Sequence, residues 1–135
     1  MNAADYGRTL HGLTVNLLVT NIEDSIPFYV DVLGLQDVYH DADVAAFAGP
    51  SGARIMLHAD HTYAKMPILS RATGISLRGL GVEIRLLGIE PDRAEARARE
   101  KGVDILVPTR VFAHGWRECH LLDPSGYVLV VGVPA

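Results

Sequence analysis

The tripeptide Pro50-Ser51-Gly52 decides how this chain is divided, because it returns 74 residues later as Pro124-Ser125-Gly126. Each copy follows an apolar stretch and opens a strand-like run, residues 53–58 after the first copy and residues 127–132 after the second. A repeat of this kind is typical of a duplicated structural unit. The sequence therefore predicts two related modules.

The first copy is preceded by a strand and a helix. Residues 13–19 form an apolar run, and the apolar residues from Ile26 to Leu33 recur at the spacing of one helix face. Gly34 suits the left-handed residue that ends a helix. Because proline breaks a helix interior, we expect Pro27 to begin the main helix after a separate first turn.

The second half repeats this order, with residues 82–87 as the strand and residues 91–101 as the helix. Gly102 corresponds to Gly34, so the glycines that end the two helices are 68 residues apart. The alternation of strand faces instead gives an offset of 69 residues between the modules. We expect a bulge or an altered turn near Gly88 to absorb this difference.

Three short strands are predicted to follow each helix. They are residues 35–40, 44–48 and 53–59 in the first half and residues 103–111, 115–122 and 127–133 in the second. The predicted fold is a single α+β domain, residues 1–135, with two tandem βαβββ modules at about residues 11–60 and 81–133. The connector at about residues 60–80 shows no convincing period, which is typical of a lid, a binding loop or a mobile linker.

The composition is that of a globular domain and argues against several function classes. The 135 residues are 49% hydrophobic and 21% charged, so the chain can bury a core without disulfides. Twelve Lys and Arg residues are scattered among sixteen Asp and Glu residues, which argues against a nucleic-acid surface. Cys119 is the lone cysteine, and no apolar run reaches the length of a membrane span. We therefore expect a cytoplasmic protein with no nucleic-acid or membrane partner.

Two stretches carry a resemblance to a known family. They are Leu17-Leu18-Val19-Thr20-Asn21-Ile22-Glu23-Asp24-Ser25-Ile26-Pro27-Phe28-Tyr29-Val30-Asp31-Val32-Leu33-Gly34 and Asp123-Pro124-Ser125-Gly126-Tyr127. They resemble the V-x-D-L-x-x-S-x-x-F-Y-x-x-V-L-G and D-P-D-G motifs of the vicinal oxygen chelate (VOC) superfamily, which includes glyoxalase I, extradiol dioxygenases and bleomycin-resistance proteins. Asn21 stands for a usual Asp, and Ser125 for the second Asp of D-P-D-G. The resemblance covers about residues 11–133 and implies a half-open-barrel cleft between the modules, commonly completed across a homodimer.

The resemblance also implies where a divalent metal would bind. The family's four ligand positions fall on Thr14, Met56, Glu83 and Val130. A divalent site needs three or four converging donors, which Thr, Met and Val beside one Glu do not supply. We therefore expect no metal and no other cofactor. The alternative is a displaced metal site, in which His58 replaces Met56 and His120 supplies another ligand.

Alternation along the strands selects the side chains that would line the cleft. The expected ligand-binding residues are Thr14, Asn16, Met56, His58, Tyr63, Arg85, Trp116 and Val130. Glu83 would orient polar groups beside Arg85 and is the candidate general base. Each assignment has an ordinary alternative. Glu83 and Arg85 would equally suit a neutral pair at a sheet edge, Trp116 a core or dimer anchor, and Tyr63 a packed loop aromatic.

The leading hypothesis is a protein, similar to the bleomycin-resistance branch, that binds a small organic molecule in the intermodule cleft without metal. The alternative is an enzyme, a glyoxalase-like lyase or isomerase or a dioxygenase relative, that uses the displaced metal site or Glu83 as base. A third hypothesis is a dimeric scaffold, which a cleft filled with side chains would favour. The sequence leaves these hypotheses open.

Overall fold

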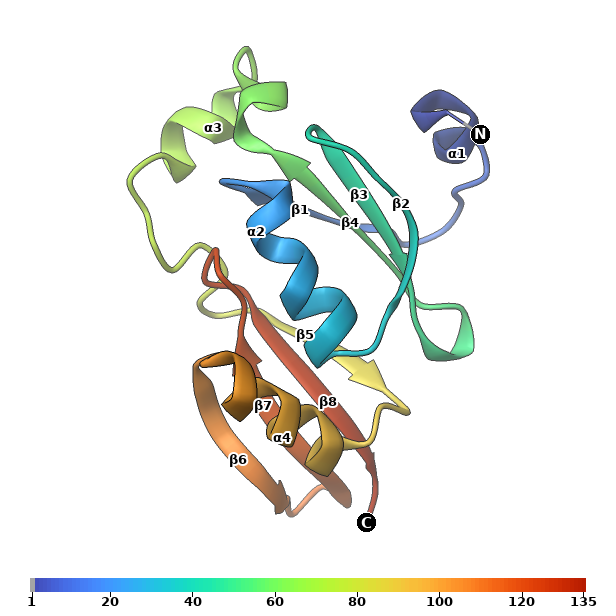
Figure 1. The fold of residues 1–135 in the computed structure, drawn as a ribbon, viewed down its shortest axis with the longest axis vertical. Helices are drawn as coiled ribbons and strands as arrows, with labels where there is room; N and C mark the ends of the chain where they lie inside the picture. The colour runs from blue at the N-terminus through green and yellow to red at the C-terminus, as the bar shows by residue number, and fades with distance from the viewer. Residues whose placement is uncertain (1) are drawn as a thin grey trace.

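The structure, a computed structural model, describes residues 2–135 and contains two four-stranded sheets (Figure 1). The first module contains β1 (Val15–Val19), α2 (Ile22–Ile26), the π-helix η1 (Pro27–Val32), β2 (Gln36–His40), β3 (Val44–Ala48), the short 3-10 helix η2 (Pro50–Gly52) and β4 (Arg54–Ala59). The second contains β5 (Glu83–Leu87), α4 (Pro91–Lys101), β6 (Ile105–Val111), β7 (Trp116–Leu122) and β8 (Val128–Pro134). The predicted α+β fold of two βαβββ modules is confirmed.

The two sheets share one topology. The first has the strand order β1-β4-β3-β2 and the second β5-β8-β7-β6. The first strand of each module therefore lies at a sheet edge, where it pairs in parallel with the last strand of the same module. The remaining neighbours are antiparallel.

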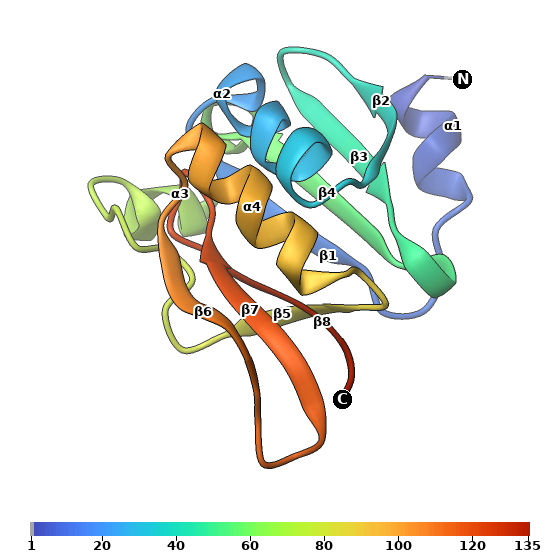
Figure 2. The ribbon, with the colours of Figure 1, turned by 60° about the horizontal axis from the view of Figure 1, so that its bottom comes forward.

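One side of each sheet faces the helices, and we call the other side its distal face. Along β4, Ile55 and Leu57 are buried toward the helices, whereas Met56 and His58 are half-buried on the distal face. The η1 helix and α4 lie next to each other in Figures 1 and 2, and Arg97 Nε donates to the carbonyl oxygen of Val32 at 2.8 Å.

The buried core draws on both modules. Its members include Leu17, Val19, Tyr29, Phe47, Leu57, Leu86, Ala94, Leu121, Leu129 and Val131. Because one apolar cluster contains the helix-facing side of both sheets, the two modules form one packing unit rather than two independent cores.

The one-residue difference between the modules lies inside the first helix. Ile22 and Pro91 begin the two helices 69 residues apart, but the left-handed Gly34 and Gly102 that follow them are 68 apart. The extra residue is accommodated by the π-helix, in which the Leu33 amide donates to the carbonyl of Phe28, five residues earlier, at 3.0 Å.

The expectation that a turn near Gly88 absorbs this difference is therefore wrong. Pro27 begins η1 and continues the helix from α2. Because proline has no amide hydrogen, it cannot make the α-helical bond to the carbonyl four residues earlier. The regular pattern is interrupted at this position, and the wider turn begins there.

The connector between the modules is folded and attached to the second repeat. It contains a 3-10 helix, η3 (Asp60–Tyr63), and a short helix, α3 (Pro67–Ala72). The Gly79 amide donates to the Gly126 carbonyl at 2.9 Å. A Cβ atom on Gly126 would lie 2.4 Å from Leu77 Cα, so the close approach of the connector requires glycine at this turn.

The structure adds one helix that the sequence analysis does not predict, α1 (Ala3–Arg8). Six residues are too few to show a helical period in the sequence. Its first turn is capped by Asn2, whose side-chain oxygen accepts from the Asp5 amide at 2.8 Å. No helix within residues 2–135 is long and apolar enough to cross a membrane.

A buried hydrogen bond joins the two halves of the chain. The Tyr29 hydroxyl donates to Asp123 Oδ2 at 2.7 Å, and the Tyr29 side chain is fully buried. Asp123 Oδ1 accepts from the backbone amides of Ser125 at 3.0 Å and Tyr127 at 2.8 Å. Burial raises the pKa of the Asp123 carboxyl, although these hydrogen bonds offset part of that rise. The first-module helix is thereby tied to the turn of the second repeat.

Replacement of Tyr29 by Phe is expected to lower the free energy of unfolding by about 1–3 kcal/mol, because it leaves a buried carboxylate oxygen without its donor. Urea unfolding measures the effect. Tyr39→Phe is the matched control, since that hydroxyl also donates to a carboxylate, Asp41, but at the surface, where a smaller loss is expected. Equal losses in the two variants would contradict the role assigned to Tyr29.

Candidate functional site

A buried carboxylate, Glu118, lies at the centre of the distal face of the second sheet. It comes from β7, where alternation places Trp116, Glu118 and His120 on the distal face and buries Cys119 toward the helices. Burial raises the pKa of the Cys119 thiol to about 11, so this side chain acts as a small apolar residue.

Arg85 neutralises this carboxylate. Its guanidinium donates to Glu118 Oε2, with the Glu118 side chain 2% exposed and the Arg85 side chain 38% exposed. Burial raises the pKa of Glu118, but hydrogen bonds from Arg85 and His120 outweigh that effect and hold the pKa below its usual value. Glu118 is therefore a fixed negative charge with a cationic partner at neutral pH.

Two histidines surround the same carboxylate. His120 Nε2 lies 3.2 Å from Glu118 Oε1, and His114 Nε2 lies 3.6 Å from that oxygen. On its other side, His120 Nδ1 lies 4.0 Å from Glu83 Oε2. The imidazole of His120 is thus placed between two carboxylates.

Aromatic rings border this polar cluster. The Arg85 guanidinium lies over the Trp116 ring at 6.0 Å from its centre. Phe112 stacks with His114 and His120 at ring-centre distances of 5.4 and 5.2 Å. The predicted residues Glu83, Arg85 and Trp116 are therefore brought together, and Val130 pairs with both Arg85 and His120 across the sheet.

Sequence reasoning missed Glu118 and Phe112. The signal that could have found Glu118 is strand alternation, which puts Trp116, Glu118 and His120 on one face. Phe112 lies in the hairpin between β6 and β7, beyond the reach of strand alternation.

A second polar cluster lies on the distal face of the first sheet. Asn16 Nδ2 donates to the Tyr63 hydroxyl at 2.8 Å, and Asn16 Oδ1 accepts from His58 Nδ1 at 2.5 Å. This arrangement leaves His58 Nε2 as an acceptor. Burial lowers the pKa of His58, which favours the neutral ring. Tyr63 reaches this cluster from the connector, and Met56 pairs with Asn16 across the sheet.

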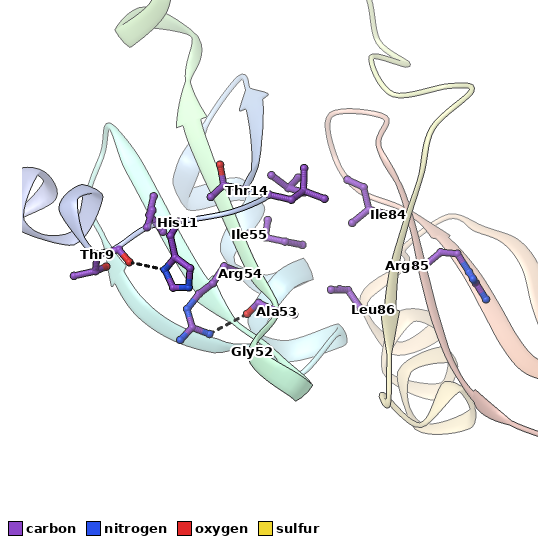
Figure 3. Close-up of a pocket in the computed structure, with 13 residues that line it drawn as sticks. Thr9, His11, Thr14, Gly52, Ala53, Arg54, Ile55, Ile84, Arg85 and Leu86 are labelled. Carbon is purple, nitrogen blue, oxygen red and sulfur yellow. Dashed lines mark hydrogen bonds between the residues drawn. The ribbon is translucent and has the colours of Figure 1, made fainter.

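A pocket of about 580 Å³ lies between the modules (Figure 3). It is lined by Thr9, Leu10, His11, Leu13, Thr14, Val15, Gly52, Ala53, Arg54, Ile55, Ile84, Arg85 and Leu86. Of the expected ligand-binding residues, only Thr14 and Arg85 are among them. Ile84 and Leu86 project from β5 toward the first module, whereas Arg85 points away from it (Figure 3). The remaining expected residues belong to the two distal clusters.

The four positions that the family uses for metal do not form a fitting donor set. Met56 offers only a soft thioether, and Val130 is fully buried and has no donor atom. Thr14 offers a neutral hydroxyl, and Glu83 is the one carboxylate of the four. Within residues 2–135, no three His, Cys, Asp or Glu side chains are grouped in a way that could hold a metal ion. No step of chemistry is therefore assigned to a metal at these positions.

Replacement of Glu118 by Gln is expected to lower the free energy of unfolding at pH 7 by about 1–2 kcal/mol, because the ionised carboxylate loses charged hydrogen bonds. A lowered pKa in the folded state means that this stabilisation is complete above the ordinary pKa, 4.5, and is lost as the pH falls through the lower folded value. The difference between wild type and variant should therefore shrink below about pH 4.5.

Urea unfolding at pH 7 and at several acidic pH values measures this dependence. Glu83→Gln, on the same face but with a half-exposed carboxylate, is the matched control and should show a smaller effect. A Glu118→Gln deficit that stays constant down to pH 3 would contradict the assignment.

Comparisons with known proteins identify the fold and the family. Residues 12–131 match the model of the Glyoxalase/Bleomycin resistance protein/Dioxygenase superfamily. The fold is similar to a protein of unknown function from Agrobacterium tumefaciens str. C58, with TM-score 0.72 and 20% identity over 93% of this chain and 95% of that one. It is also similar to a glyoxalase/bleomycin resistance protein/dioxygenase family enzyme from Burkholderia phytofirmans PsJN, with TM-score 0.72 and 19% identity over 90% and 97% of the two chains.

A glyoxalase-related enzyme from Fulvimarina pelagi gives TM-score 0.70 and 16% identity over 92% of this chain and 88% of that one. No curated protein matches the sequence. Because the family match spans most of the chain and the topology agrees with it, this protein belongs to the Glyoxalase/Bleomycin resistance protein/Dioxygenase superfamily.

Proposed function

We propose that this protein binds a small organic molecule in the pocket between its two modules. The observation that carries the proposal is the pocket itself, whose volume of about 580 Å³ lies within the ~300–1,000 Å³ of typical small-molecule sites. Both modules contribute to its walls, and ligand sites commonly lie between packed structural units.

The lining has the mixture that small-molecule sites use. Leu13, Val15 and Ile84 supply apolar surface, and Thr9, Thr14 and Arg54 supply a few polar groups that would orient a ligand. Among residues 2–135, the lining contains no Asp, Glu or Cys, and His11 is the one lining side chain of a type that commonly binds divalent metals. The proposed binding is therefore independent of metal.

Replacement of Thr14 by Trp is expected to block binding, because an exposed side chain at the pocket wall is exchanged for one large enough to fill it. A fragment library screened by ¹⁵N NMR provides the measurement. Fragments that bind should shift the amides of residues 13–15, 53–55 and 84–86, and their affinity should fall at least about tenfold in Thr14→Trp.

Thr20→Trp is the matched control, since Thr20 is exposed just beyond the end of β1 and outside this pocket. It should leave fragment binding unchanged. A library without any fragment that shifts these amides would overturn the proposal, and so would equal binding to wild type and Thr14→Trp.

The second candidate function is that of an enzyme acting on the distal face of the second sheet. The placement of His120 between Glu118 and Glu83 favours it, because an imidazole flanked by carboxylates is a common arrangement for moving protons. Because no three metal-ligating side chains within residues 2–135 are grouped to hold an ion, this candidate is expected to act without metal. Elemental analysis of protein purified without chelator checks this, and one divalent ion per chain that is lost in His120→Gln would contradict it.

A further inference from the structure

We infer that the ligand of the intermodule pocket is an amphipathic anion, with an acidic head group at Arg54 and an apolar body against Leu13, Val15 and Ile84. This inference rests on the proposed function, because it names the chemical class of the molecule that the pocket would hold. It is argued from the charges, the orientation and the burial of the lining residues.

The pocket differs in charge from the rest of the chain. The protein has sixteen Asp and Glu residues against twelve Lys and Arg residues, a formal net charge of −4. None of the thirteen residues that line the pocket is acidic, whereas two are Arg and one is His. The pocket is therefore a local positive region on an acidic protein, where an anionic ligand is favoured over a cationic one.

Only one of the two arginines is available to a ligand in this pocket. Arg85 points away from the pocket and is engaged with Glu118 (Figure 3). Arg54 forms no ion pair among residues 2–135, and its Nη1 donates only to the carbonyl of its neighbour Ala53, at 3.1 Å. A guanidinium has five N–H donors, so Arg54 retains donors that would suit a carboxylate or another acidic group.

His11 lines the same side of the pocket as Arg54 but does not add a donor for the head group. Its Nδ1 lies 3.3 Å from the carbonyl oxygen of Thr9, which assigns the Nδ1 hydrogen to that bond and leaves Nε2 of the neutral ring as an acceptor. Figure 3 shows His11 and Arg54 projecting from the first module, across the pocket from Ile84 and Leu86. Arg54 therefore lies on the first-module side of the pocket, opposite a side formed by apolar residues of β5.

The apolar wall would take the rest of the ligand. Ile55 and Leu86 are almost fully buried in the core, whereas Val15 and Ile84 are half-buried and keep apolar surface that a ligand can cover. Leu13, also in the lining, is 94% exposed and is the most exposed large apolar residue of the described chain. A ligand with an apolar tail would cover this surface and gain free energy from its burial.

Three probes that carry a straight apolar chain of seven or eight carbons on different head groups test the inference: octanoate, 1-octanol and octyltrimethylammonium. Each is titrated into ¹⁵N-labelled protein at pH 7 and constant ionic strength, and the amides of residues 13–15, 52–55 and 84–86 report binding. Octanoate is expected to bind at least about tenfold more tightly than octyltrimethylammonium, because only octanoate can accept a charged hydrogen bond from Arg54. Octanol should fall between them.

Arg54→Gln is expected to reduce octanoate affinity to about that of octanol. Arg93→Gln, which makes the same charge change at an exposed position of α4 outside the pocket, should leave it unchanged. Equal affinity for the anionic and cationic probes would overturn the inference and leave the proposed function standing, as would an anion preference that survives Arg54→Gln. If none of the three probes shifts the pocket amides, the inference fails, whereas the proposed function is decided separately by the fragment screen.

Discussion

The hydrogen bond between Tyr29 and Asp123 marks the constraint on which the rest of the structure depends, namely that two small modules must share one core. One side of each sheet is apolar and is covered by a helix, and the two helices lie against each other between the modules. Tyr29 is on the helix of one module and Asp123 is in the repeat turn of the other, so their bond holds the shared core in register. The π-helix keeps this geometry despite one additional residue in the first module.

The shared core also determines where polar groups can be placed. Since the helix-facing sides are apolar, the polar side chains of the strands are restricted to the distal faces and to the unpaired edges of β1 and β5. The distal face of the second sheet holds the Arg85–Glu118–His120 cluster, and that of the first holds Asn16 and His58. The intermodule pocket lies between these two edges, and it receives apolar side chains from both modules and Arg54 from the first.

Much of the fold could be predicted from local pattern. The repeated Pro-Ser-Gly tripeptide located the modules, and alternation assigned Met56 and His58 to the face opposite Ile55 and Leu57, as the burial of β4 confirms. The candidate site was less accessible. Arg85 and Trp116 were both among the expected cleft residues, but the ion-pair partner of Arg85, Glu118, lies 33 residues away in the sequence. Whether a side chain at a sheet edge faces a pocket depends on the distance between the two sheets. No local spacing in the sequence encodes that distance.

The sequence by itself determined the duplicated module, the strand faces and the family, because each depends on residues that are close along the chain or that recur at a fixed spacing. Only the tertiary structure decided that Arg85 turns toward Glu118 and away from the pocket, which leaves Arg54 as the arginine available there. It also decided that the extra residue resides in a π-helix and not at Gly88. The physical reason is the same in each case: pairing of charges and accommodation of an extra residue are settled by packing between segments far apart in the chain.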